Sequence, residues 1–431
     1  MKRSIVVLFI FLLLLLIGCQ SKAQLDNTRI DSSNDIPTLW CESFDIDRSG
    51  LTIKVDAKIN GINKERFPIY EIAATPFTET DIELIINSIS PNAQICPYQI
   101  DKNGNNIPIK AVLEEEICTQ MDEISLFSEI EDDELQDAQS KSEMMDFLNQ
   151  ELTELQELYS SAVDAEYSDD YSTLLDSPEL LEAAVFNSEN EYIGCLNIIN
   201  GLYGDVRENM VSMNIPYKHL MEPSAAFPTS TRSIQDSILT AEDLLQKIHV
   251  DDFTLNRVDY SPEYDRCSLY YTRQVNGFPY SSAFESTPLA DMDGSQLKLL
   301  FEMYWHDEYI RIDTGDYGIC FFEWVSKSHI MNLRREEVLL PFSTIQKLFR
   351  RYIEYVGSYY KSFYGNEKGS ITVTGLDLGY KRVPIKDRAG KYEVVPVWSF
   401  EGYYDSSKLN NTMKDSTVIL VINAIDGSLI G

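Results

Sequence analysis

Few residues of this sequence could carry out covalent or metal chemistry, and their surroundings complete no site. Asp291 and Asp293 stand two residues apart, before Gly294-Ser295. Two carboxylates in this spacing can bind magnesium while one of them attacks phosphate. Such a pair has to follow an apolar strand, however, and here the polar residues 285–288 precede it. We therefore predict a turn before a helix at 291–295.

Two Ser-x-x-Lys pairs have the spacing in which a lysine activates a serine nucleophile, namely Ser295 with Lys298 and Ser358 with Lys361. The Ser-x-Asn and Lys-Thr-Gly motifs that complete such sites do not follow either pair. The four histidines stand singly, without the H-E-x-x-H spacing that binds zinc; they are His219, His249, His306 and His329. The sequence therefore predicts no catalytic residue, no metal ligand and no cofactor site, and we do not expect an enzyme.

A polar segment at 101–106 superficially resembles a calcium-binding loop. An EF-hand loop needs glycine at its sixth position and a bidentate glutamate at its twelfth, and these positions hold Asn106 and Val112. The segment is better explained as the turn of a hairpin between strands at 98–100 and 107–112.

The first nineteen residues predict export and lipid attachment. Lys2 and Arg3 precede the thirteen apolar residues Ile5–Ile17, and a helix of that length reaches only ~20 Å, short of the ~30 Å hydrocarbon core of a bilayer. The following Leu16-Ile17-Gly18-Cys19 resembles the lipobox of bacterial lipoproteins. This resemblance implies cleavage after Gly18, lipidation of Cys19 and an extracytoplasmic protein anchored in the cell membrane by its acyl chains.

Two alternatives to the lipobox remain open, namely an ordinary signal peptide with a chance cysteine and an uncleaved anchor.

The composition of the chain sets further limits on its domains and partners. Its 431 residues suggest two or three domains, and a formal net charge of −33 excludes general nucleic-acid binding. The six remaining cysteines are either buried thiols or up to three disulfides; they are Cys41, Cys96, Cys118, Cys195, Cys267 and Cys320.

Composition divides the chain into a signal peptide and four blocks. The signal peptide covers residues 1–18, a polar tether 19–36, a β-rich N-terminal domain 37–113, an acidic helical segment 114–182 and a C-terminal α+β region 183–431. Within 37–113, the alternation of Leu51, Ile53, Val55, Ala57 and Ile59 with polar residues predicts a strand. Thr78 and Asp81 predict the capped start of a helix.

The acidic segment and a later basic region give the chain opposite local charges. Residues 114–182 contain 23 Asp or Glu and one Lys, while residues 334–414 contain 14 Lys or Arg and nine Asp or Glu. Apolar residues at alternating spacings of three and four predict one long acidic amphipathic helix at about 134–163. Three interpretations of the charges stay open: solvated surfaces, docking of the two regions on each other, and contact with an envelope protein or an anionic polymer.

Residues 238–431 show the clearest order of elements. A helix capped at Thr240 is followed by strands at 254–260 and 266–275, and Asn276-Gly277 is typical of a type I′ hairpin turn. A second helix, marked by Ile345, Leu348, Phe349, Tyr352, Ile353 and Val356, is followed by further strands at 376–383, 393–400 and 417–425.

The segment 271–279 resembles the helix-strand-strand-turn signature of PepSY-like and protease-propeptide modules. Together with Leu378-Gly379-Tyr380, residues 395–400 and residues 422–428, the C-terminal half resembles a family of uncharacterised lipoproteins of Gram-positive bacteria. It is more remotely similar to YycH and YycI, the extracytoplasmic regulators of a cell-wall sensor kinase. These motifs consist of strand and turn residues, so the resemblance implies a fold and no catalytic residue.

The sequence therefore predicts an α+β lipoprotein with antiparallel sheets, packed helices and PepSY-like units. We expect it to act as a non-catalytic binding or regulatory module whose partners are the membrane, through its lipid anchor, and an envelope protein or anionic polymer. An envelope hydrolase with an unrecognised site and a sugar- or peptide-binding lipoprotein are the alternatives.

Overall fold

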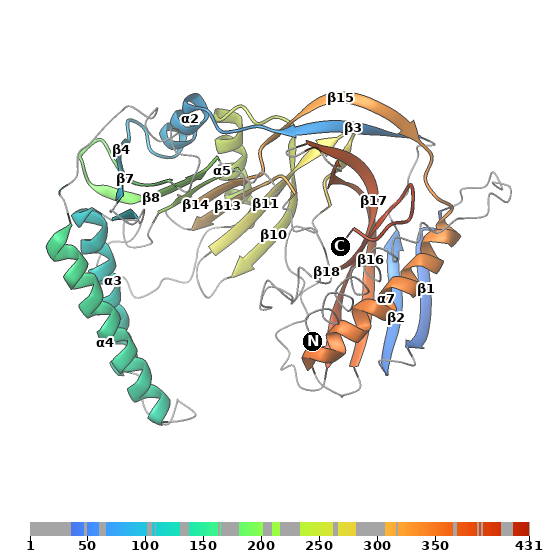
Figure 1. The fold of residues 1–431 in the computed structure, drawn as a ribbon, viewed down its shortest axis with the longest axis horizontal. Coiled ribbons are helices and arrows are strands. Elements are labelled where there is room, and N and C mark those ends of the chain that lie inside the picture. Colours follow the sequence, from blue (N-terminus) through green and yellow to red (C-terminus); the bar gives the residue numbers. More distant parts are fainter. Residues whose placement is uncertain are drawn as a thin grey trace, which may run out of the picture. The chain divides into compact units, whose positions relative to one another are not determined.

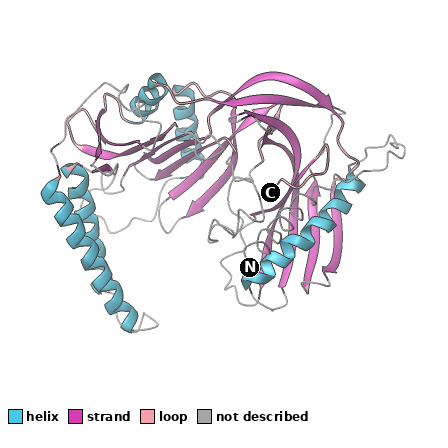
Figure 2. Cartoon of the chain, viewed as in Figure 1, coloured by secondary structure: helices cyan, strands magenta, loops and turns pink. Residues whose placement is uncertain are grey.

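Two β-sheets contain most of the strands in the computed structural model of the chain, and five helices accompany them in the part of the chain that it describes (Figures 1 and 2). This mixture of helices with mainly antiparallel strands confirms the predicted α+β class. Residues 37–431 form one compact unit. The described residues are 36–46, 50–59, 66–100, 106–107, 109–129, 138–162, 164, 181–200, 209–215, 233–261, 266–281, 307–315, 318–364, 369–385, 388, 391–406 and 417–430.

The first sheet, sheet A, joins strands from both ends of the described chain. Its order is β1 (Leu39–Ile46), β2 (Leu51–Ile59), β16 (Gly369–Pro384), β17 (Lys391–Ser406), β3 (Phe67–Ala74) and β15 (Ser328–Glu337), with β18 (Thr417–Asn423) paired to β17. The predicted alternation in β2 is confirmed, because its five apolar residues are buried. β2 pairs in parallel with β16, which comes more than 300 residues later.

The second sheet, sheet B, is antiparallel. Its order is β10 (Phe253–Ser261), β11 (Arg266–Val275), β13 (Tyr309–Gly315), β14 (Gly318–Val325), β9 (Met210–Asn214), β8 (Tyr192–Ile199), β7 (Leu181–Phe186) and β4 (Gln94–Pro97). Helices α2 (Glu79–Ile89) and α5 (Ile234–Lys247) bury their apolar residues against this sheet, in one cluster with Leu269, Ile310 and Phe322. The helices form because apolar side chains recur on one face of each.

The starts of α2 and α5 show one correct and one wrong prediction. The cap at Thr78 is confirmed, since its hydroxyl accepts a hydrogen bond from the backbone N–H of Asp81 and the Asp81 carboxylate accepts one from the N–H of Thr78. The predicted cap at Thr240 is wrong, because α5 begins after Ser233, which forms the same reciprocal pair with Asp236. Thr240 lies inside the helix and donates to the Asp236 carbonyl four residues earlier (2.9 Å).

The described residues of the acidic segment contain parts of two helices where the sequence predicts one. The predicted helix corresponds to α4 (Ala138–Ser161), and α3 (Lys110–Glu129) precedes it. Among the described residues of the hairpin predicted at 98–112, β5 (Gln99–Ile100) and β6 (Asn106–Ile107) form strands, and α3 begins at Lys110, within the predicted second strand. Residues 101–105 of the predicted turn lie outside the described residues. Among the residues that the structure describes, no helix has the length and apolar character needed to cross a membrane.

Helix α7 (Phe342–Tyr364) covers part of sheet A through the apolar face predicted for it. Ile345, Phe349 and Ile353 are fully buried. The Phe349 ring stacks on Phe400 of β17 with 4.6 Å between ring centroids, and Trp40 of β1 meets Phe349 edge-on at 5.3 Å. The structure does not describe the side chain of Val356, the last residue of the predicted face.

The hairpin predicted at Asn276-Gly277 is confirmed and connects the two sheets. Both residues have positive φ, 54° and 84°, between β11 and the short strand β12 (Phe278–Pro279). Beyond the turn, Ser281 donates its N–H to the Tyr380 carbonyl of β16 (2.8 Å). A side chain at Gly379 would stand 2.9 Å from the Pro279 carbonyl oxygen, so this close contact between hairpin and sheet A requires glycine.

Gly402 of β17 is the basis of a first stability prediction. A Cβ atom at this position would overlap the carbonyl oxygen of Thr372 in β16, a backbone atom that cannot turn away. Gly402→Ala is therefore expected to lower the free energy of unfolding by roughly 2–3 kcal/mol in urea denaturation. Gly375→Ala, at the neighbouring bulge, is the matched control, because its Cβ would come no closer than 3.5 Å to any atom. Equal losses in the two variants would contradict the prediction.

Candidate functional site: a pocket where strand β17 changes its neighbour

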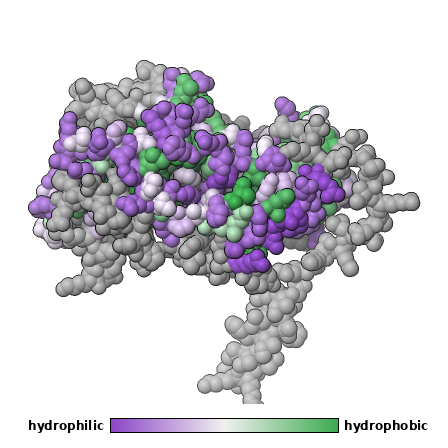
Figure 3. All heavy atoms as spheres, turned by 90° about the horizontal axis from the view of Figure 1, so that it is seen from above, coloured by the Kyte–Doolittle hydropathy of each residue, from purple (hydrophilic) through white to green (hydrophobic). Residues whose placement is uncertain are grey.

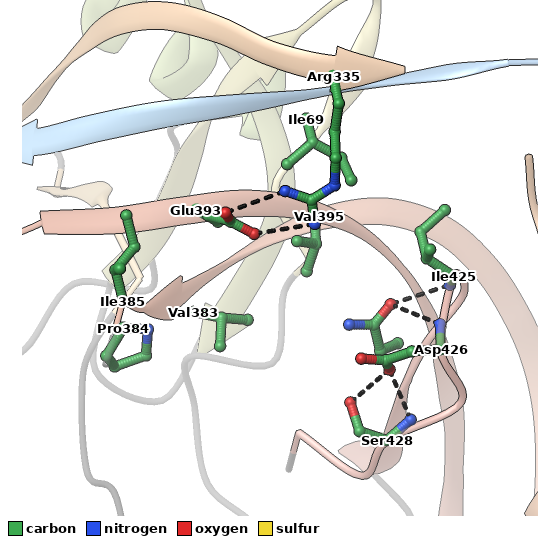
Figure 4. Close-up of a pocket in the computed structure, with 11 residues that line it drawn as sticks. Ile69, Arg335, Val383, Pro384, Ile385, Glu393, Val395, Ile425, Asp426 and Ser428 are labelled. Atoms are coloured by element: carbon green, nitrogen blue, oxygen red, sulfur yellow. Dashed lines mark hydrogen bonds and ion pairs between the residues drawn. The ribbon is translucent and has the colours of Figure 1, made fainter. Parts of the chain in front are cut away.

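Strand β17 has two different neighbours along one of its edges. Its residues 391–394 pair with β3, and its residues 397–402 pair with β18. Between these two stretches the sheet forks, and a pocket of about 360 Å³ lies at the fork (Figure 4). A change of partner strand thus produces a hollow in what is otherwise a continuous sheet.

Aliphatic side chains from four elements form the apolar part of this pocket. Ile69 of β3 and Val395 of β17 are buried, while Val383 of β16 and Ile425, after β18, are half-buried. All four belong to one apolar cluster that continues under β18. The close packing of this cluster fixes the shape of the pocket before any ligand arrives.

Arg335 of β15 forms a charged wall of the pocket. It donates from Nη1 and Nη2 to the two carboxylate oxygens of Glu393 (3.0 and 3.1 Å), and its Nε lies 3.2 Å from Glu337. The hydrogen bond with Glu393 raises the pKa of Arg335, although partial burial acts against this. The Arg335 side chain is still 43% exposed, so a ligand can reach its remaining N–H groups.

The turn after β18 forms the other side of the pocket. In Figure 4, Asp426 and Ser428 lie on one side of Val395, and Arg335 and Glu393 lie on the opposite side. The Asp426 carboxylate accepts hydrogen bonds from the N–H (2.9 Å) and the hydroxyl (2.7 Å) of Ser428. An exposed carboxylate and an exposed guanidinium therefore stand on opposite sides of an aliphatic floor.

More cations of the predicted basic region surround Glu71 on the adjoining surface. Arg334, Arg388 and Lys391 lie 3.9, 3.8 and 3.6 Å from its carboxylate, which is almost buried. Other described ion pairs of residues 334–414 go to Glu42, Asp307, Glu337 and Glu393. The carboxylates in these described ion pairs thus all lie outside the acidic segment 114–182.

A second polar cluster is buried where sheets A and B meet. The carboxylate of Glu308, directly before β13, accepts hydrogen bonds from Nε and Nη2 of Arg273 (2.8 and 2.9 Å). It also accepts hydrogen bonds from the backbone N–H and the hydroxyl of Ser328. The adjacent Asp307 binds Lys381 of β16 (2.6 Å). Both carboxylates are fully buried and paired with cations. Their geometry is that of a structural link, since a general base needs a carboxylate free to take a proton.

The sequence-predicted site residues fall in different parts of the chain. Cys19 and Gly18, residues 291–298, His219 and His306 lie outside the described residues. Ser358 and Lys361 lie on α7, in a stretch whose side chains are not described. His329 Nδ1 forms a hydrogen bond with the Thr75 hydroxyl (2.7 Å). No disulfide joins the six cysteines, and in the described part of the chain no His, Cys, Asp and Glu side chains are grouped as a metal site.

Apolar side chains outside the pocket are exposed in small groups. Ile330, Met331 and Leu333 of the edge strand β15 are 42%, 44% and 53% exposed. Seen from above, the described atoms are mainly hydrophilic, with hydrophobic residues in small patches between them (Figure 3). Small patches of this kind are normal on a soluble protein, so the pocket is the stronger candidate site.

No protein-family model matches the chain, and no curated protein matches it. Among solved structures, an uncharacterised protein from Eubacterium rectale superposes with a TM-score of 0.46 at 11% identity, over 91% of this chain and 93% of that one. The C-terminal domain of YpeB from Bacillus megaterium superposes with a TM-score of 0.29 at 9% identity, over 60% of this chain and 84% of that one. Superpositions at these scores do not establish a common fold or function.

Proposed function

We propose that this chain is a lipoprotein anchored through Cys19 on the outer face of the cytoplasmic membrane, where it acts as a binding or regulatory module without catalysis. The basic Lys2-Arg3, the short apolar segment and Leu16–Cys19 support the anchor. The resemblance of the C-terminal half to PepSY-like lipoproteins and to the YycH and YycI regulators supports the regulatory part.

The pocket at the fork of β17 is the observation that carries the binding role. A volume of about 360 Å³ and an aliphatic floor with a few fixed polar groups are typical of sites for small ligands. The separation of Arg335 from Asp426 by this floor suits a ligand with an aliphatic centre and polar ends. A peptide segment with one aliphatic side chain has this chemistry.

The same geometry disfavours a hydrolase at this position. The Glu393 carboxylate forms a bidentate pair with the Arg335 guanidinium and accepts a further hydrogen bond from Arg334 (2.9 Å). Both oxygens of this carboxylate are already engaged by guanidinium groups, which leaves it poorly placed to exchange a proton with a substrate. Binding of peptides, rather than their cleavage, is therefore the function that these residues support best.

Filling the pocket tests the binding role. Val383→Phe adds a ring at the half-buried floor, and Val338→Phe, at a valine that is 42% exposed and outside the pocket lining, is the control. Acetylated tripeptides with a central Val or Leu are expected to bind the wild type and Val338→Phe equally, and to bind Val383→Phe at least about tenfold more weakly. Calorimetry or ligand-detected NMR provides the measurement. Equal binding to both variants, or no binding at millimolar concentration, would contradict a peptide-binding pocket.

A further inference from the structure

Helices α3 and α4 form an antiparallel hairpin (Figure 1). The contacts between them run in opposite directions along the two helices: Lys110 binds Asp164, Glu114 accepts a hydrogen bond from Tyr159, and Gln120 donates to the Leu148 carbonyl. The apolar stripe predicted for α4 is the face that meets α3, because Leu148 is buried, and Leu152, Leu155 and Tyr159 are half-buried. This stripe is thus already used inside the hairpin.

The hairpin is attached to sheet B at one end. Ile109 and Val112 are buried there in a cluster with Cys96, Tyr98 and Phe186. Beyond this attachment, from residue 117 to residue 161, the described side chains are half-buried or exposed, with Leu148 as the exception. Most of the hairpin surface therefore faces solvent in the described structure.

A second apolar stripe runs along one flank of α4. Met144, Phe147 and Leu158 are 44%, 53% and 48% exposed. Together with Glu151 and Glu154 they follow spacings of three and four residues, so all five share one flank of the helix, beside the stripe that packs on α3. Large exposed apolar side chains on a regular helical spacing are typical of a surface that receives another helix.

The charge of the hairpin limits what can cover this flank. Helices α3 and α4 together contain eleven Asp or Glu and two Lys, a net charge of −9. A second copy of the hairpin would bring like charges together, and anionic lipid headgroups would be repelled in the same way. A partner with apolar residues on one face and Lys or Arg on the other matches both the stripe and the charge.

We propose that this flank of α4, with its stripe Met144, Phe147, Glu151, Glu154 and Leu158, is a docking surface for a positively charged amphipathic helix of a partner protein. The apolar side chains of the partner, which recur at i, i+3, i+4 and i+7 along its helix, contact Met144, Phe147 and Leu158. Its Lys or Arg side chains reach Glu154, which is exposed and accepts a hydrogen bond from Gln150 (2.9 Å), and the half-buried Glu151, which accepts one from Gln120 of α3 (3.2 Å). The flank uses none of the residues that line the pocket, so this interaction does not depend on the peptide-binding role.

A designed peptide tests the surface without knowledge of the partner. The probe contains only leucine and lysine, is about 18 residues long, and places its leucines on one helical face. A peptide of the same composition in scrambled order is the control for charge alone. Fluorescence anisotropy with residues 20–431 of the chain is expected to show at least about tenfold tighter binding of the ordered peptide, and binding that weakens as salt is raised.

Two matched variants locate the site. Phe147→Gln removes the aromatic side chain of the stripe and is expected to weaken binding of the ordered peptide at least about fivefold. Met121→Gln, at an apolar residue of α3 that is equally exposed at 53%, is expected to leave binding unchanged. Circular dichroism checks that both variants keep their helices.

Three results would overturn the proposal. The scrambled peptide could bind as tightly as the ordered one, which would reduce the interaction to charge. Phe147→Gln could bind like the wild type, which would place the peptide elsewhere. Sedimentation could show a dimer of the wild type that Phe147→Gln dissociates, which would identify a second copy of the chain as the occupant.

Discussion

Arg273→Met is expected to lower the free energy of unfolding by about 3–5 kcal/mol, because it leaves the carboxylate of Glu308 buried without its cation. The Glu308 side chain is fully buried, and the Arg273 side chain is 10% exposed. Burial opposes the charge on Arg273, but Glu308 and Asp252 raise its pKa, so the guanidinium stays charged. Urea denaturation followed by tryptophan fluorescence measures the loss.

The control for this prediction is a similar pair in a more exposed position. Arg257 pairs with Asp259 on β10, and their side chains are 36% and 42% exposed. Arg257→Met is expected to cost less than about 1 kcal/mol, because water screens exposed pairs. Combining Arg273→Met with Glu308→Gln removes both charges and is expected to restore part of the stability. If Arg273→Met costs no more than Arg257→Met, the buried pair contributes no more to stability than the exposed one.

Cys19→Ser is expected to abolish membrane anchoring through lipid. Serine has no thiol to accept the diacylglyceryl group, and without that lipid the cleavage after Gly18 does not follow. Labelled palmitate should therefore enter the wild type and not the variant, and the variant should keep residues 1–18, which is visible by intact mass. Cys41→Ser is the matched control, since it removes an exposed cysteine of β1 and leaves the lipobox intact.

One outcome would remove the anchor from the proposed function. If Cys19→Ser matures to the same length as the wild type and stays with membranes after a salt wash, Leu16–Cys19 is not a lipobox. The protein would then be held by an uncleaved helix or by a partner. Incorporation of palmitate into Cys19→Ser would point to a different lipidated residue.

Local patterns allowed much of the secondary structure to be predicted. The alternation in β2, the reciprocal hydrogen bonds at Thr78 and the turn at Asn276-Gly277 each depend on residues close together in sequence. The same locality explains the error at α5, where Ser233 with Asp236 and Thr240 with Asp243 both have the spacing of a cap. Helical residues between them let the helix extend back to the earlier cap.

The candidate site could not be predicted, because it depends on contacts between distant residues. Arg335 and Glu393 are 58 residues apart, and Ile69 reaches the pocket from a strand more than 300 residues before Val395. The sequence shows the basic region that contains Arg335 and the turn at Asp426-Gly427. It does not show that β17 pairs first with β3 and then with β18, and this change of partner creates the pocket.

The parallel pairing of β2 with β16 has a consequence for how the chain is made. Synthesis delivers β1, β2 and β3 first, but their neighbours in sheet A, β16 and β17, follow about 300 residues later. During that interval the early strands have exposed edges, which are prone to aggregation. Closing a loop of this length also makes assembly slow. A ribosome-bound chain that stops before residue 369 should therefore leave Leu51–Ile59 sensitive to protease, and release of the complete chain should protect it.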